Sequence, residues 1–171
     1  MRRALAAAVL VFLSCGGANA MEDQNEALAG VAELFLHDAL EPTFGKEYLK
    51  LESLDFSVAS LRLIDEYLDV VPKLKGFDRN QLQVILRTGA YVGEVIRRNS
   101  KTAQWRWLNY ETAKTISPTA FDRFGKIPAT AAVPYNGKTF AFPLAKVQKR
   151  LTNEPEDSLQ FYGSALVSFS R

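Results

Sequence analysis

The sequence predicts an α+β fold in which helices and a small antiparallel sheet occupy separate stretches of the chain. Over residues 25–98, apolar side chains recur every three to four positions, the spacing of helices that bury one face. The pattern changes to alternation at 105–110 and on both sides of an Asn-Gly pair, which is typical of strands joined by tight turns. Helical spacing returns after residue 143. We therefore expect N-terminal helices, about three strands and C-terminal helices.

Two amphipathic helices are predicted before residue 72. The first covers 25–40 and ends before Pro42; the second is capped by Asp55 or Ser57 and ends at Pro72. The apolar face of the first consists of Leu28, Val31, Phe35 and Ala39. The apolar face of the second consists of Val58, Leu61, Ile64, Leu68 and Val71. Both helices carry acidic residues on their other faces, so those faces are expected to meet water.

A third helix is predicted from Asp78, as its N-cap, to Arg98, with Arg97 and Arg98 favourably placed at the negative end of its dipole. Apolar residues on two of its sides indicate a central helix buried between other elements. Gly89 and Gly93 lie four residues apart on one face, and each costs about 1 kcal/mol of helix propensity relative to alanine. We expect the backbone of another strand or helix to approach closely there, because such a contact offsets that cost.

The segment 105–110 alternates in the manner of a strand and is rich in aromatic residues. Trp105 and Trp107 share one face of this strand, and Arg106 lies on the other face. The following segment, 111–128, contains proline and glycine and no clear period. We expect it to be irregular.

A β-hairpin is predicted with Asn136 and Gly137 at its turn, because both residues tolerate positive φ. Its two flanking segments are 129–135 and 138–142. Pro134 cannot donate a hydrogen bond to a ladder, which places its strand at an edge. Pro143 and Pro155 suit the first turns of two final helices. The inner face of the last helix consists of Leu159, Tyr162, Leu166 and Phe169.

The first twenty residues have the three zones of a secretory signal peptide. Arg2 and Arg3 provide the positive start, nine apolar residues follow over 5–13, and an Ala-Asn-Ala sequence ends at Ala20. The apolar stretch is far below the ~20 residues that a membrane-spanning helix needs. We therefore expect cleavage after Ala20, a periplasmic or secreted protein without a transmembrane span, and a single domain over 21–171.

Cys15 leaves a second fate of the leader open. The preceding residues faintly resemble a lipobox, although that motif requires leucine and a small residue where Phe12 and Leu13 stand. Acylation of Cys15, which would make the chain a structural lipoprotein domain, is therefore an alternative. Cleavage after Ala20 would instead leave a chain without cysteine, which excludes disulfides, thiolate nucleophiles and Cys-bound metals.

Charged residues are distributed unevenly along the chain. Residues 22–69 hold twelve acidic and three basic side chains, a net charge of −9, whereas 70–151 hold fifteen basic and four acidic ones, a net charge of +11. We expect the two segments to attract each other when folded; a basic surface for an anionic partner is the alternative. No block of Lys and Arg is dense enough to indicate a nucleic-acid-binding segment.

The run Gly-Ala-Tyr-Val-Gly-Glu-Val-Ile-Arg-Arg over 89–98 is followed within ten residues by Trp105-Arg106-Trp107. This combination resembles a pattern in small uncharacterised bacterial α+β domains that have no assigned activity. The resemblance covers about twenty residues, and 142–151 more loosely. It implies the fold neighbourhood and no chemistry.

Glu94 is the first candidate for a chemical role, because an acidic group near a core must be paired or have a perturbed pKa. Arg87, Arg98 or Arg106 could neutralise it, and Arg98 has the i,i+4 spacing of an ion pair. The favoured interpretation is a buried ion pair that orients the third helix against the tryptophan strand. The alternative is a general acid or base in a small cell-wall hydrolase.

Trp105 and Trp107, with Arg97, Arg98 and Arg106 around them, are candidates for an aromatic and basic binding surface. Such a surface could stack on a sugar ring or bind a protein; packing of both rings in the core is the competing interpretation.

His37, the only histidine, lies four residues from both Glu33 and Glu41. This spacing could hold a divalent metal weakly, but a solvated surface histidine is the favoured interpretation, and we predict no metal and no cofactor.

The sequence favours an exported, non-catalytic binding or accessory domain of the bacterial cell envelope, of inhibitor or immunity-like type. We expect its partner to be a protein or another envelope component, bound around Trp105 and Arg97. The alternative function is the hydrolase with Glu94, and with His37 as a further acid or base.

Overall fold

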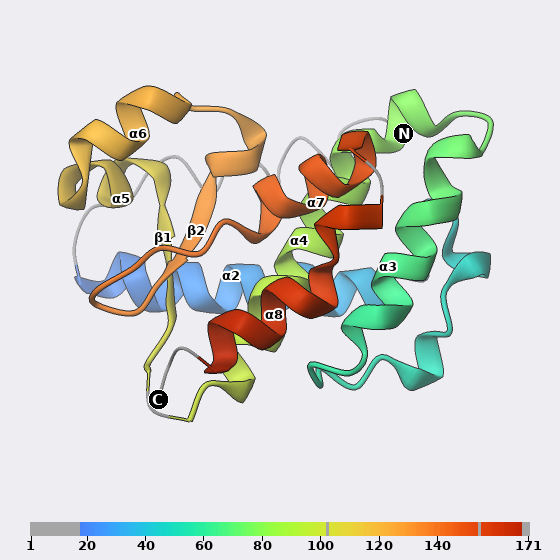
Figure 1. Cartoon of the computed structure of the whole chain (residues 1–171), viewed down its shortest axis with the longest axis horizontal. Helices are drawn as coiled ribbons and strands as arrows, with labels where there is room; N and C mark the ends of the chain where they lie inside the picture. The colour runs from blue at the N-terminus through green and yellow to red at the C-terminus, as the bar shows by residue number, and fades with distance from the viewer. Residues whose placement is uncertain (1–17, 102, 154, 169–171) are drawn as a thin grey trace.

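The computed structural model describes residues 18–101, 103–153 and 155–168 (Figure 1). Its helices are α2 (Ala18–His37), α3 (Leu61–Val70), α4 (Phe77–Asn99), α5 (Tyr110–Ile116), α6 (Pro118–Phe124), α7 (Pro143–Asn153) and α8 (Leu159–Ser168). Its strands are β1 (Arg106–Asn109) and β2 (Ala132–Tyr135). Short 3₁₀ turns occur at Lys46–Tyr48, Leu51–Ser53, Val71–Lys73, Pro128–Thr130 and Pro155–Asp157. Helices and one small antiparallel sheet agree with the predicted α+β class.

The predicted leader lies outside the described residues except for its last three, with which α2 begins. Cys15 and the apolar stretch 5–13 are among the residues not described. No helix in the described ranges combines the length and the apolarity that crossing a bilayer requires.

Helix α4 is the central element, as its two apolar sides predict. Every residue from 87 to 96 is buried, and α2, α7 and α8 all contact this helix (Figure 1). The N-cap is Gly76, with a φ of 95°, and not Asp78, which lies in the first turn. Glycine takes the capping position because the chain enters the helix with a left-handed residue, a conformation that aspartate adopts less readily.

The glycines of α4 lie at two different close approaches. A Cβ on Gly89 would lie 2.8 Å from Cα of Leu144, so the backbone of α7 occupies the groove, as expected. A Cβ on Gly93 would instead lie 2.1 Å from the ring of Trp107. At this second glycine the approaching group is therefore a side chain from β1 and not a backbone.

The acidic and the basic segments of the chain are joined by ion pairs, which confirms that they attract each other. Arg87 of α4 pairs with Asp38 at 2.6 Å, and Arg150 of α7 pairs with Asp69 of α3 at 2.5 Å. Asp65 of α3 also accepts the backbone N–H of Leu159 at 2.8 Å and caps the start of α8. Helix α3 is thus bound to both C-terminal helices.

The sheet has two strands, and the prediction of about three is wrong. Strands β1 and β2 are antiparallel, with Trp107 opposite Pro134, while the segment after the turn contributes only one bridge, between Tyr135 and Phe140. The side chain of Asn136 accepts the N–H groups of Lys138 and Thr139, which tightens the turn. The N–H of Phe142 donates to the Tyr162 hydroxyl, so the third segment leaves the sheet early.

The segment predicted to be irregular, 111–128, forms the two short helices α5 and α6. The side chain of Asn109 caps α5 by accepting the N–H of Thr112 at 2.9 Å. Pro118 begins α6, and Gly125, with a φ of 71°, ends it. These helices cover one face of the sheet through a small separate core of Leu108, Tyr110, Ala113, Phe121 and Val133.

Candidate functional site

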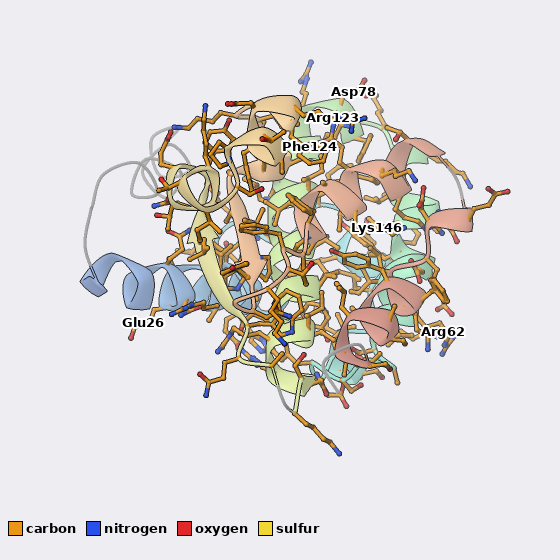
Figure 2. The ribbon with its side chains drawn as sticks, turned by 60° about the vertical axis from the view of Figure 1, so that its left-hand side comes forward. Glu26, Arg62, Asp78, Arg123, Phe124 and Lys146 are labelled. Atoms are coloured by element: carbon orange, nitrogen blue, oxygen red, sulfur yellow. The ribbon has the colours of Figure 1, made fainter. Side chains whose placement is uncertain are left out.

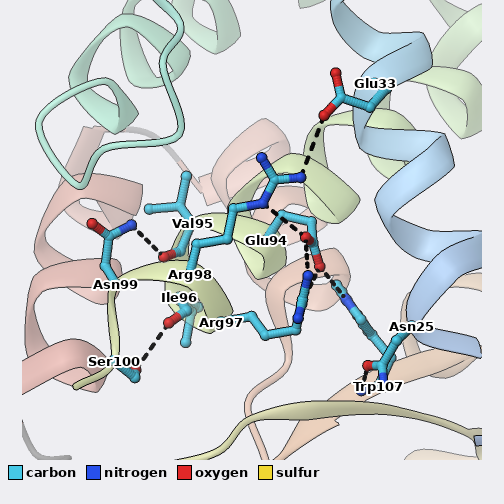
Figure 3. Close-up of polar contacts among 10 residues, drawn as sticks. All are labelled: Asn25, Glu33, Glu94, Val95, Ile96, Arg97, Arg98, Asn99, Ser100 and Trp107. Carbon is cyan, nitrogen blue, oxygen red and sulfur yellow. Dashed lines mark hydrogen bonds and ion pairs between the residues drawn. The ribbon is translucent and has the colours of Figure 1, made fainter. Parts of the chain in front are cut away.

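Glu94 lies at the junction of α4 with β1, and its side chain has no exposed surface (Figure 3). Its carboxylate accepts hydrogen bonds from Nε and Nη2 of Arg97 at 2.7 and 2.8 Å. It also accepts from Nε of Arg98 at 3.0 Å and from the indole Nε1 of Trp107 at 3.0 Å. Four donors therefore surround the carboxylate, which meets the requirement for a buried charge.

The Glu94 network extends to the N-terminal helix. Nη2 of Arg98 donates to Glu33 of α2 at 3.3 Å, and the same guanidinium lies 3.7 Å above the ring of Phe56. The side chain of Asn25, also on α2, accepts the backbone N–H of Trp107 at 2.8 Å (Figure 3). The network consequently joins α4 to β1, as the structural interpretation of Glu94 predicts, and it also includes α2, which that interpretation did not name.

The environment of Glu94 lowers its pKa. Burial acts in the opposite direction and would raise the pKa, but the hydrogen bonds from Arg97 and Trp107, the charge of Arg97 and the hydrogen bond from Arg98 outweigh it. The hydrogen bond to Glu94 in turn raises the pKa of Arg97. Glu94 is therefore a carboxylate at neutral pH, without a proton to donate.

Comparisons with known protein families, curated proteins and solved structures find no match to this chain. The resemblance of the segment 89–107 to bacterial α+β domains remains a prediction.

The structure brings Arg97 and Arg98 to Glu94 but not the other two candidate arginines. Arg106 is exposed on β1 and forms no ion pair among the described residues. Arg87 lies at the N-terminal end of the buried part of α4, where its guanidinium pairs with Asp38, the residue after α2. Sequence spacing identified Arg98 through the i,i+4 rule, and the i,i+3 position of Arg97 was an equally available signal.

Arg87 organises the C-terminal end of α2. Its Nη1 donates to the carbonyl of Glu41 at 2.8 Å and to Oγ1 of Thr43 at 3.3 Å, and its Nη2 donates to Asp38 at 2.6 Å. The guanidinium thus satisfies groups at the end of a helix that would otherwise lack partners. Sequence reasoning missed this role because the partners lie more than forty residues away.

We expect Arg87→Lys to lower the free energy of unfolding by about 1–2 kcal/mol. The two Nη groups of the guanidinium bind Asp38 and the Glu41 carbonyl at the same time, and a lysine ammonium cannot bind both. Urea denaturation measures the change. The matched control is Arg79→Lys on the exposed side of α4, which should change stability by less than about 0.5 kcal/mol. Equal effects of the two substitutions would contradict the capping role.

Neither tryptophan forms an exposed platform. Trp105 is 5% exposed and Trp107 is fully buried, so both rings belong to the main core, and the competing interpretation of core packing is confirmed. The rings are covered because α2 and α4 both pack on that face of the sheet. Arg97 and Arg98 keep about a third of their side chains exposed, but their head groups are bound to Glu94.

His37 is exposed at the last residue of α2. Glu33 pairs with Arg98, and Glu41 lies beyond the helix end, where Asp38 accepts its backbone N–H. The three side chains therefore do not form a cluster, and no group of three potential metal ligands occurs among the described residues.

Sequence reasoning missed a second group of aromatic residues, which we name the hairpin aromatic surface. It consists of Phe124, Tyr135, Phe140 and Phe142. Each ring contacts the next, in a row that runs from the hairpin to the end of α6. All four rings keep some solvent exposure. Figure 2 shows Phe124 next to Arg123 on the outside of the molecule. The signal was the density of aromatic residues around the turn at Asn136.

Proposed function

We propose that the chain is an exported, non-catalytic binding domain of the bacterial cell envelope, of inhibitor, immunity-like or accessory type. The observation that carries the proposal is the state of Glu94. This carboxylate is fully buried and bound to Arg97, Arg98 and Trp107, all of which serve the packing of α4 against β1. It is a structural group and therefore does not indicate a reaction.

The alternative, a cell-wall hydrolase with Glu94 as its acid, lacks support. A general acid must carry a proton near the working pH and must reach the substrate within hydrogen-bond distance. The pKa of Glu94 is lowered, and its side chain has no exposed surface. His37, the other candidate, is an exposed residue at a helix end and belongs to no cluster of three potential acidic or metal-binding groups among the described residues.

The proposed binding surface differs from the one around Trp105 that the sequence favoured. Because both indole rings are buried, the hairpin aromatic surface replaces them as the aromatic contact. Arg106, one of the predicted binding residues, stays exposed opposite Tyr135 in the sheet register and borders this surface. The proposal includes no cofactor and no metal. Its partner is a protein or another component of the envelope.

Expression of the full chain with a C-terminal tag in the native bacterium tests this proposal. We expect the protein in the periplasm or medium, beginning at Met21 by mass spectrometry, and in a stoichiometric complex with an envelope component. We also expect no release of soluble fragments from purified cell wall.

An intact chain in the cytosol would contradict the proposal that the protein is exported. Acylation at Cys15 would show that the protein is a lipoprotein and not a secreted domain. Fragment release that a His37→Ala variant abolishes would favour the hydrolase.

A further inference from the structure

The hairpin aromatic surface is a continuous apolar patch. The rings of Tyr135 and Phe140 stack with centroids 4.5 Å apart, Phe142 lies 6.4 Å from Phe140, and Phe124 lies 5.4 Å from Phe142. Phe124, at the end of α6, is 52% exposed. Tyr135, Phe140 and Phe142 are partly buried, because they pack on the small core beneath α5 and α6, and each keeps part of its surface in water beside Phe124. Contiguous partly exposed rings on a small domain indicate an interaction site, because aromatic side chains contribute most of the affinity in protein interfaces.

Positive charge borders this patch without compensation. Arg106, Arg123 and Lys138 are exposed, and none of them has an ion pair within the described part of the chain. The only two acidic residues of the segment 101–142 are neutralised, because Glu111 pairs with a lysine at 2.6 Å and Asp122 pairs with another at 2.6 Å. A surface with surplus positive charge complements an anionic partner.

The backbone next to the patch has an open hydrogen-bonding edge. On the β2 side, Ala141 N–H donates to the carbonyl of Pro134 at 2.8 Å, and Asn136 N–H donates to the carbonyl of Thr139 at 3.3 Å. Phe140 lies between Thr139 and Ala141, the two residues that form these hydrogen bonds. Because the direction of hydrogen bonding alternates along an antiparallel strand, the N–H and C=O of Phe140 point away from β2. Neither group of Phe140 has a hydrogen bond to another described residue.

We propose that the hairpin aromatic surface docks an extended polypeptide segment with acidic and apolar side chains, which pairs its backbone with Phe140. This inference rests on the proposed function and assigns the binding surface and the chemistry of the partner. The aromatic rings hold the apolar side chains, and Arg106, Arg123 and Lys138 attract the acidic ones. A polypeptide is the favoured anion because, unlike a lipid headgroup, it presents N–H and C=O groups in strand register to the open edge.

A synthetic peptide of about ten alternating glutamate and valine residues tests the proposal, because its extended form satisfies both requirements. Titration into the full mature chain, followed by NMR of backbone amides, should shift the signals of 138–142 and protect the N–H of Phe140 from exchange. We expect a dissociation constant in the submillimolar range that rises with added salt. The triple variant Arg106→Glu, Arg123→Glu and Lys138→Glu should weaken binding by at least about tenfold.

The matched control reverses three other exposed cations, located around the start of α4: Lys73→Glu, Lys75→Glu and Arg79→Glu. It changes the net charge equally and should keep the affinity within about twofold, because these residues belong neither to the hairpin nor to α6. Equal weakening by both triple variants, or absence of peptide binding, overturns the proposal. Binding of phosphatidylglycerol vesicles without binding of the peptide also overturns it, in favour of a membrane surface.

The failure of this inference is distinguishable from that of the proposed function. If the first triple variant still co-purifies with the envelope component of the wild-type chain, the binding surface is wrong and the binding function stands. If the wild-type chain has no envelope partner, the proposed function fails, whatever the peptide does.

Discussion

Gly93→Ala is expected to lower the free energy of unfolding by about 3–4 kcal/mol, although alanine is the better helix former. The added methyl group would lie 2.1 and 2.3 Å from two ring atoms of Trp107, where no carbon can remain. The indole cannot simply rotate away, because it is fully buried and its Nε1 donates to Glu94. Relief of the clash therefore strains the core and removes a hydrogen bond from a buried carboxylate.

Chemical denaturation with tryptophan fluorescence as the signal measures this effect. The matched control is Gly30→Ala, because Gly30 is a helical glycine of α2 whose added Cβ would meet no atom within 4 Å. That substitution should raise stability by about 1 kcal/mol. If both glycine substitutions stabilise the protein, Trp107 does not lie against Gly93 and the described packing of β1 on α4 is wrong.

The two α4 glycines also illustrate how far the sequence predicts this fold. Their cost in helix propensity indicated close approaches to α4, and their spacing placed both on one face. The nature of the approaching groups was not predictable, because Leu144 and Trp107 lie beyond the helix in the chain and only the packed structure brings them there. Periodicity describes a single element, whereas the contact is a property of two.

The prediction that the two tryptophans form an exposed binding platform is wrong for a related reason. Alternation placed Trp105 and Trp107 on one face of a strand and Arg106 on the other. In the structure Trp107 is buried and Arg106 is exposed on β1, and Trp105 is buried just before the strand begins. Alternation does not say whether a face is covered, because that depends on where α2 and α4 pack on one side of the sheet and α5 and α6 on the other. The helices α5 and α6 were missed although the caps Asn109 and Pro118 were visible, because their short apolar faces have too few turns to establish a period.

Glu94→Gln is expected to lower the free energy of unfolding by about 2–3 kcal/mol at neutral pH. Loss of one member of a buried ion pair costs up to about 5 kcal/mol, but here Arg97 and Arg98 are each about one-third exposed and recover part of that cost in water. The matched control is Glu66→Gln, which removes an exposed i,i+4 pair with Arg62. It should change stability by less than about 0.5 kcal/mol.

The pH dependence of this difference distinguishes a structural carboxylate from a catalytic acid. Since the folded state lowers the pKa of Glu94 below its ordinary value of 4.5, its stabilisation is complete well above pH 4.5, where both states are deprotonated. Below that pH the unfolded chain binds the proton first, and the difference between wild type and Glu94→Gln should shrink as the pH falls through the folded pKa. Urea denaturation at a series of pH values measures it. A poised general acid has a raised pKa, so a difference that instead changed between pH 5 and 7 would contradict the structural role and restore the hydrolase hypothesis.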